Sequence, residues 1–246
     1  TKVGSREPGR RYGRQVLLKG ASMRKVFQAE LHHIGEQLVE MSVLVHNAME
    51  HACTALRTAD LELAQEVIAA DARIDFLQNA LDERVIEILA LQSPVATDLR
   101  TTVASLRMSA SLERMGDLAR HIAQLTRLRY PAQAIPERLS ATFAELTDLD
   151  LAIAGRVTQL LTERDLDLVR QITDDKARIN QLHAGVFTAL AADDWDKSGP
   201  ETVDVALASR YFERFADHGV SVARKVEYLV TGQWQPSTEA EQPSRS

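Results

Sequence analysis

The feature that most constrains the fold is a regular spacing of apolar side chains that begins at Phe27. Apolar residues then recur at alternating steps of four and three positions: Phe27, Leu31, Ile34, Leu38, Met41, Val45, Ala48, Ala52 and Ala55. A spacing near 3.5 residues is typical of long helices that pack almost parallel in a bundle. Glycine and proline are scarce before the C-terminal tail, so little interrupts a helical interpretation. The chain is therefore expected to be all-α.

Breaks in this pattern divide the chain into six expected helices. The first ends near "RTAD", where Asp60 is the expected N-cap of a second helix that runs to about Leu91. After the loop "QSPVATD", a third helix is expected from about Ala96 to Arg129. The segment "RYPAQAIPER" contains two prolines and is the best candidate for a boundary between domains. Three more helices are expected at about residues 137–162, 165–192 and 201–231.

Three short sequences recur in the same order in the two halves. "ADLELA" (59–64) resembles "RDLDLV" (164–169), and "ARIDFL" (72–77) resembles "ARINQL" (177–182). "SLERMGDLARH" (111–121) resembles "YFERFADHGVS" (211–221). The shared order indicates an internal duplication. The expected organisation is a tandem repeat of two three-helix bundles, with the first unit at residues 23–130 and the second at residues 137–231.

The two ends of the chain are expected to lie outside the bundles. Residues 1–22 are basic and glycine-rich and are interpreted as a leader or a disordered arm. Residues 232–246 are polar and rich in proline and serine, as in a disordered tail.

Composition narrows the class of function. No run approaches the ~20 apolar residues that a membrane-crossing helix needs. With one cysteine, Cys53, no intramolecular disulfide can form, which favours the cytoplasm. Cys53 is interpreted as a small buried side chain rather than a catalytic thiol. The net charge of −6 argues against nucleic acid as a main partner.

Pairs of carboxylates occur four residues apart on three of the expected helices, and residues at this spacing share one face of a helix. The pairs are Asp71 with Asp75, Glu113 with Asp117, and Glu213 with Asp217. The apolar spacing of Leu99, Val103, Leu106 and Ala110 leads directly into Glu113 and Asp117. These acids are therefore expected at buried positions, and the small residues beside them, such as Gly116, are expected to leave room between the helices.

A bound cation would explain acids in such places. If the second and third helices are antiparallel neighbours, Asp71, Asp75, Glu113 and Asp117 converge, and their mutual repulsion predicts a metal ion. Oxygen ligands suit Mg²⁺, Mn²⁺, iron or Ca²⁺, and a nitrogen from His121 would extend the choice to Zn²⁺.

One observation weighs against a metal ion, and an alternative interpretation explains the acids without one. In the second unit, Lys176 and Asn180 stand where the first unit has Asp71 and Asp75, so a metal site there is less complete. The alternative is that the acids only form ion pairs with arginines such as Arg114, Arg120, Arg210 and Arg214.

These motifs together resemble the PhoU family of phosphate-signalling regulators. The similarity extends from about Met23 to Trp234 and rests on "MRKVFQAELHHI", "SPVATDLR", "LERMGDLARHIA" and "YFERFADHGVSVARKVEYLVTG". The resemblance implies an all-helical fold of two tandem three-helix bundles, with E/D-x-x-x-D motifs that bind metal ions in some members. The matching positions are Asp71, Asp75, Glu113, Asp117, Glu213 and Asp217.

The resemblance also implies a function. A PhoU-like protein is expected to repress the phosphate-starvation response by coupling a sensor histidine kinase to the ATPase subunit of a phosphate-specific ABC transporter. It would meet the membrane only through these partners, it would not be an enzyme, and a homodimer is left open. The expected cofactors are divalent or trivalent metal ions (Mg, Mn, Fe or Zn). The rival hypothesis is a metal-dependent hydrolase or oxidase, which the absence of a recognisable base or nucleophile beside the acids disfavours.

Overall fold

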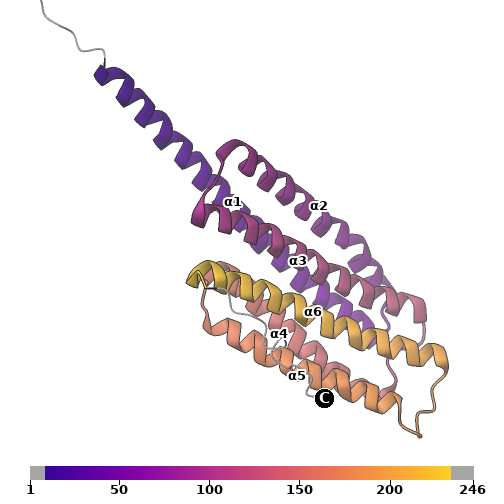
Figure 1. The fold of residues 1–246 in the computed structure, drawn as a ribbon. Coiled ribbons are helices and arrows are strands. Elements are labelled where there is room, and N and C mark those ends of the chain that lie inside the picture. The colour runs from indigo at the N-terminus through magenta and orange to yellow at the C-terminus, as the bar shows by residue number, and fades with distance from the viewer. Residues whose placement is uncertain (1–8, 234–246) are drawn as a thin grey trace, which may run out of the picture.

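The computed structural model describes residues 9–233, with side chains described from Arg24 onward. Within this range every regular element is a helix, which confirms the all-α prediction (Figure 1). None of these helices combines the length and the apolar character needed to cross a membrane. The elements are α1 (Gly9–Thr58), α2 (Leu61–Gln92), α3 (Ala96–Arg129), the short 3-10 helix η1 (Glu137–Leu139), α4 (Ser140–Glu163), α5 (Asp167–Leu190) and α6 (Gly199–Thr231).

The start of α1 differs from the sequence-based expectation. This helix begins at Gly9, inside the segment 1–22 that was interpreted as a leader or a disordered arm. Residues 9–22 contain no proline, the residue that stops a helix most effectively, so nothing in their sequence ends the helix before Met23. Residues 1–8, and all of the predicted tail after Gln233, lie outside the described residues.

The other helices begin and end close to the predicted residues. Asp60 caps α2 as expected, because its carboxylate accepts a hydrogen bond from the backbone N–H of Leu63 at 3.0 Å. Helix α6 begins at Gly199, slightly earlier than predicted, because Ser198 and Glu201 form a capping box in which each side chain bonds the other residue's backbone.

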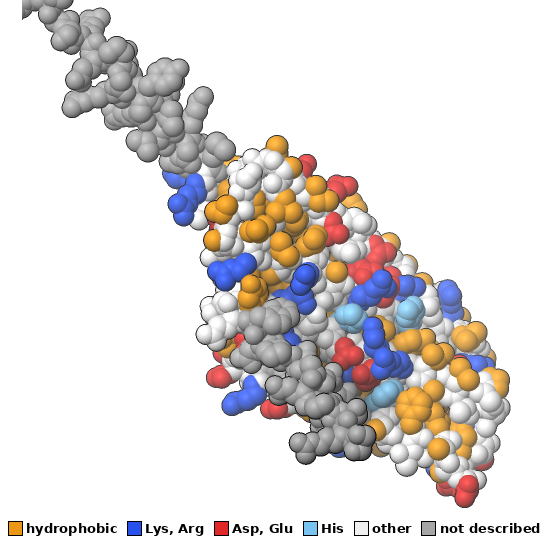
Figure 2. All heavy atoms as spheres, viewed as in Figure 1, with side chains coloured by type: hydrophobic (Ala, Val, Ile, Leu, Met, Phe, Trp, Pro, Cys, Tyr) orange, Lys and Arg blue, Asp and Glu red, His pale blue; other side chains and the backbone are white. Residues whose placement is uncertain are grey.

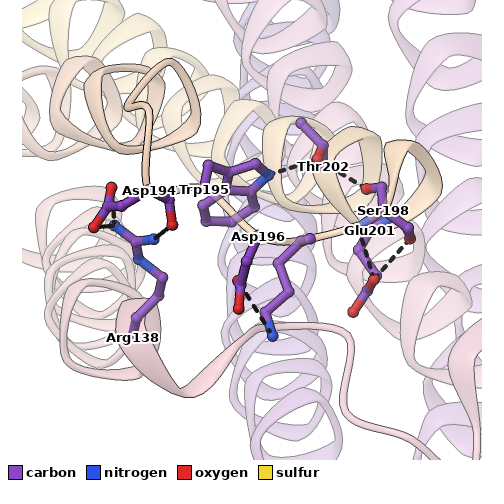
Figure 3. A network of polar contacts seen from close by, with 8 residues as sticks. Arg138, Asp194, Trp195, Asp196, Ser198, Glu201 and Thr202 are labelled. Carbon is purple, nitrogen blue, oxygen red and sulfur yellow. Dashed lines mark hydrogen bonds and ion pairs between the residues drawn. The ribbon is translucent and has the colours of Figure 1, made fainter.

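The connection between α5 and α6 is tied to the start of the second bundle (Figure 3). The indole N–H of Trp195 donates to the Thr202 hydroxyl at 2.7 Å, and the Arg138 guanidinium lies 5.3 Å from the centre of the indole ring. Arg138 also donates to the backbone carbonyl of Asp194 at 3.1 Å. Trp195 thus packs locally and fixes this loop.

The helices pack as two three-helix units, α1–α3 and α4–α6, which lie side by side (Figure 1). The predicted apolar stripe of α1 is buried at Phe27, Ile34, Leu38, Met41 and Val45, and α1 also contacts α4 of the second unit. The units are joined most closely by α3 and α6, which run antiparallel. At one end of this pair Arg129 forms an ion pair with the buried Asp204, and at the other end the Arg100 guanidinium lies 5.9 Å from the centre of the Tyr228 ring.

The buried face of α3 is not the predicted one. Leu99 and Val103 are 41% and 37% exposed, and Ala110 is exposed as well. The buried positions carry mostly small or hydroxyl side chains, and the hydroxyls of Ser105 and Ser109 donate to backbone carbonyls one turn earlier. Because α3 contacts α1, α2 and α6, it needs small side chains on several sides. The apolar residues Leu99 and Val103 therefore lie on the remaining side of α3, which faces solvent.

Candidate metal sites

The four carboxylates of the first unit lie near one another where α2 meets α3. The pKa of Glu113 is raised, first by burial and then by the charge of Asp117, with smaller effects of Asp75 and Asp71. The pKa of Asp71 is also raised, by burial and by Asp75 and Asp117, although Arg120 opposes the shift. Such mutual effects require short separations. We call Asp71, Asp75, Glu113 and Asp117 the first cluster.

Arginines of α3 already neutralise part of the first cluster. Arg120 Nε lies 2.5 Å from Asp71 Oδ2, and Arg120 also bonds Asp117. Arg114 Nη1 donates to Asp117 Oδ2 at 2.8 Å, while its Nε lies 3.5 Å from Glu113 Oε2. Burial alone would raise the pKa of Asp117, but the hydrogen bond and the charge of Arg120, helped by Arg114, outweigh it and lower this pKa. Of the two guanidinium groups, that of Arg120 is the more buried and contacts both helices.

The carboxylates of the first cluster are suitable donors for a metal ion, but their positions in the structure are not those of a metal site. Four carboxylates are the donors that a hard cation prefers. Within residues 24–233, however, no three His, Cys, Asp or Glu side chains are placed so as to hold a metal ion. Arg120 contacts both Asp71 and Asp117, so a metal ion shared by them requires this side chain to move away. The observed contacts are those of the alternative interpretation, in which the acids pair with arginines.

Small residues beside the first cluster do not leave empty space. A Cβ atom built at Gly116 would lie 2.8 Å from Ile74 Cδ1 and 3.4 Å from Asp71 Oδ1. Gly116 therefore allows α2 and α3 to approach closely, and the expected room for a ligand is filled by Ile74. His121, one turn beyond Asp117, faces Tyr211 at 5.2 Å between ring centres, and its Nδ1 has no hydrogen-bond partner within the described residues. Burial and the charge of Arg120 lower the pKa of His121, which favours a neutral ring.

In the second unit a lysine side chain supplies the positive charge between the two acids. Lys176 Nζ lies 2.8 Å from Glu213 Oε1, 2.8 Å from Asp217 Oδ1 and 3.0 Å from the backbone carbonyl of Glu213. These three contacts match the three protons of an ammonium group. Arg210 also bonds Glu213, at 2.5 Å. We call Lys176, Glu213 and Asp217 the second cluster; its acids are neutralised without a metal ion.

The cation that neutralises the acids lies on a different helix in each unit. Lys176 matches Asp71 in the repeat alignment, so the residue on the second helix of each unit changes from acid to base. On the third helix of each unit the change is from a base to an apolar residue, because Arg120 of α3 matches Val220 of α6. The cation that contacts two acids therefore comes from α3 in the first unit, as Arg120, and from α5 in the second, as Lys176.

The sequence analysis missed Asp150, a buried acid on α4. This side chain is completely buried, and neither carboxylate oxygen has a hydrogen-bond partner among the described residues. Burial raises its pKa well above the usual value, opposed by the charge of Lys176 and reinforced by Glu213. Asp150 lies in the buried series of α4 between Leu146 and Ile153, so an acid in an apolar stripe was the signal that could have revealed it.

Cys53 of α1 is buried, as predicted. Burial, with a small contribution from Asp150, raises the pKa of its thiol to about 12, although a hydrogen bond with Thr147 opposes the shift. A thiol of this kind is almost fully protonated near neutral pH and is a poor nucleophile. The structure thus favours the packing role of Cys53 over a catalytic one.

Comparisons with known proteins add independent information. The sequence matches the family described as "PhoU domain" over residues 38–126 and 143–226, one match in each unit. A Mycobacterium tuberculosis protein named "Phosphate-specific transport system accessory protein PhoU homolog 2" is 39% identical over 210 residues, which are 85% of this chain and 99% of the relative. A Mycobacterium leprae protein, named homolog 1 of the same accessory protein, is 37% identical over 85% of this chain and 95% of its own length.

Solved structures share the fold. The crystal structure of PhoU from Pseudomonas aeruginosa superposes with a TM-score of 0.77 at 26% identity and covers 84% of this chain and 100% of its own. That of the phosphate transport system regulatory protein PhoU from Streptococcus pneumoniae has a TM-score of 0.75 at 23% identity, over 86% of this chain and 100% of its own. The names of these relatives describe accessory and regulatory proteins rather than enzymes.

Proposed function

Because the chain belongs to the PhoU domain family, we propose that it is a regulatory accessory protein of a phosphate-specific transport system. The observation that carries this proposal is the extent of the similarity: the family match covers both units, and a relative with this name is matched over 99% of its length. In this role the chain represses the phosphate-starvation response while phosphate is ample. It acts in the cytoplasm by binding its partners, a sensor histidine kinase and the ATPase subunit of the transporter.

The packing of the two units suits such an adaptor. Arg129 of α3 and Asp204 of α6 form an ion pair, Ser111 lies 3.4 Å from Ser221, and the faces of α3 and α6 between these points are largely buried. Partners bound to different units would therefore be held in a constant relative position. This supports a mechanism in which the transporter and the kinase contact one rigid scaffold.

We restrict the metal proposal to the first cluster. Asp71, Asp75, Glu113 and Asp117 would hold a Mg, Mn, Fe or Zn ion in exchange for the Arg120 guanidinium, and the ion would neutralise the acids and tie α2 to α3. Glu213 and Asp217 were also predicted as ligands. Because Lys176 neutralises them, the second unit is proposed to retain its lysine instead of a metal ion.

Deletion of the gene tests the regulatory role. In the source bacterium, a reporter under a phosphate-starvation promoter should become active in high phosphate when the gene is deleted, and the wild-type gene should restore repression. Purified chain should also bind the cytoplasmic part of the sensor kinase and the ATPase subunit. A reporter that stays silent after deletion, together with no binding to either partner, would refute the proposal.

Elemental analysis of tag-free protein tests the metal separately. We expect bound metal that is lost in Asp71→Asn/Asp117→Asn and retained in the control Asp174→Asn, which changes an exposed acid on α5. If the wild-type protein and both variants carry the same amount of metal, the first cluster is not the site. Partner binding that is the same with and without a chelator would exclude a role of the metal in docking.

A further inference from the structure

A groove lies between α3 and α6, at the end of the helix pair where α3 begins and α6 ends. Its volume is about 360 Å³. We call it the α3–α6 groove, and it is lined by Leu99, Arg100, Val103, Ala104, Arg107, Lys225 and Tyr228. The C-terminal end of α6 lies beside this groove, because a Cβ atom on Gly232 would lie 3.5 Å from Arg100 Nη1. Three of the seven lining residues are cations and none is an acid.

These cations lack the partners that other arginines of the protein have. Arg73, Arg84 and Arg178 each contact a carboxylate at 2.5–2.7 Å. No carboxylate of the described residues lies within ion-pair distance of Arg107 or Lys225, nor of Arg100, whose guanidinium bonds the Thr97 hydroxyl at 3.1 Å. The chain has a net charge of −6, so acids outnumber bases, and a group of three cations with no acid beside them is not expected from the composition.

Lys225 carries the clearest sign of an unbalanced positive charge. Burial and then the charges of Arg107 and Arg224 lower its pKa. Its ammonium donates to the backbone carbonyl of Ser221 at 3.0 Å and to the Ser221 hydroxyl at 2.6 Å, which leaves one proton for a further acceptor. Arg224 and Tyr228 have further contacts of their own, so the argument rests on Arg100, Arg107 and Lys225.

The rest of the lining is apolar. Leu99 and Val103 are the residues that the packing of α3 displaces to the solvent side, and Ala104 and the Tyr228 ring complete the wall. Figure 2 shows apolar side chains gathered over α2 and α3 on this face, with Lys and Arg side chains beside them. A groove of this size with an apolar wall and a few charged groups has the composition of a small-ligand site.

We propose that the α3–α6 groove binds a phosphate group carried by an apolar or aromatic body, as in a nucleotide or a phospholipid. A phosphate has several oxygens and can accept hydrogen bonds from both Arg107 and Lys225. The guanidinium group of an arginine can also bind two phosphate oxygens at once. The apolar body would lie against Leu99, Val103 and the Tyr228 ring. The site is distinct from both acid clusters, and the proposal does not depend on the proposed regulatory function.

Binding of defined probes to the full chain tests the proposal. Calorimetry would measure binding of AMP, ATP, inorganic phosphate and, for comparison, sulfate, and co-sedimentation would compare phosphatidylglycerol vesicles with phosphatidylcholine vesicles, all at constant ionic strength. The groove variant is Arg107→Gln/Lys225→Gln. The control, Arg127→Gln/Arg170→Gln, removes the same charge from exposed residues elsewhere. Circular dichroism would verify that both variants are folded.

We expect at least one phosphate-bearing probe to bind saturably, and the groove variant to bind it about tenfold more weakly or worse while the control is unchanged. Binding of a nucleotide would identify a soluble ligand, and binding of phosphatidylglycerol vesicles alone would identify a headgroup. The proposal is overturned if no probe binds at concentrations up to about 10 mM, if sulfate binds as well as phosphate and the nucleotides do, or if both double variants bind alike.

Discussion

Replacing Lys176 with methionine removes the cation of the second cluster and should cost the protein several kcal/mol of stability. Lys176 is 8% exposed, and methionine has a similar length, so the main change is the loss of a charge, of two hydrogen bonds to Glu213 and of the ion pair with Asp217. Removing one partner of a buried ion pair typically costs 3–5 kcal/mol, because the remaining charge stays buried. Glu213 keeps Arg210, and the side chain of Asp217 is 42% exposed and can regain water. We therefore expect the lower end, about 3 kcal/mol.

Urea unfolding followed by circular dichroism would measure this loss. In a protein of about two hundred residues, a loss of about 3 kcal/mol in the free energy of unfolding corresponds to a fall in Tm of roughly 6–12 °C. The matched control is Arg178→Met, two residues further along α5, because Arg178 pairs with Glu145 at 2.6 Å and both side chains are over 40% exposed. Exposed ion pairs contribute at most about 1 kcal/mol. If Lys176→Met and Arg178→Met lose the same small amount of stability, Lys176 is not a buried substitute for a metal ion.

Further predictions concern packing, pH and capping. Gly219→Ala places a Cβ 2.5 Å from Ile153 Cγ2, which cannot move without rotating the whole side chain, so urea unfolding should show a loss of about 1–2 kcal/mol. Gly116→Ala makes its one close contact with the flexible end of Ile74, Cδ1 at 2.8 Å, while its other neighbours lie at 3.4 Å, so helix propensity should hold its change within about 0.5 kcal/mol. The raised pKa of Asp150 means that the native state binds this proton more tightly than the unfolded chain, so stability is lost as pH rises above about 4. Unfolding curves from about pH 4 to about pH 8 should therefore show Asp150→Asn gaining on the wild type as pH increases; a constant difference would contradict this. Asp60→Ala should cost about 1 kcal/mol in thermal unfolding, and no change would exclude a capping role.

Sequence periodicity predicted the helices well because their ends are set by local chemistry. Asp60 caps α2 through a bond within its own turn, and Pro94 and Pro131 lie just after the ends of α2 and α3, because a proline inside a helix removes a backbone hydrogen bond. The stripe on α1 was also correct, since that helix buries one continuous apolar face. Local signals of this kind do not depend on knowing the neighbouring helices.

The buried face of α3 could not be predicted in the same way. Its sequence offers two faces, an apolar one that contains Leu99 and Val103 and a small-residue one that contains Ser105 and Ser109. The hydrophobic pattern favours the first, whereas contact with three other helices selects the second. For the acid pairs, spacing predicted which carboxylates share a face, but not that Arg120 would reach across to Asp71. Long cationic side chains have several rotamers, and their partners are decided only after the helices have packed.

The antiparallel contact between α3 and α6 has a consequence for how the protein can be divided. Each half of the duplicated sequence is long enough to form a three-helix bundle, yet each contains one helix with a serine-containing surface that is covered by the matching helix of the other half. A half expressed by itself would expose that surface, and its likeness to the missing partner would favour self-association into a dimer that imitates the natural pair. The duplicated chain is thus best regarded as a covalently linked dimer, whose halves should melt in one step.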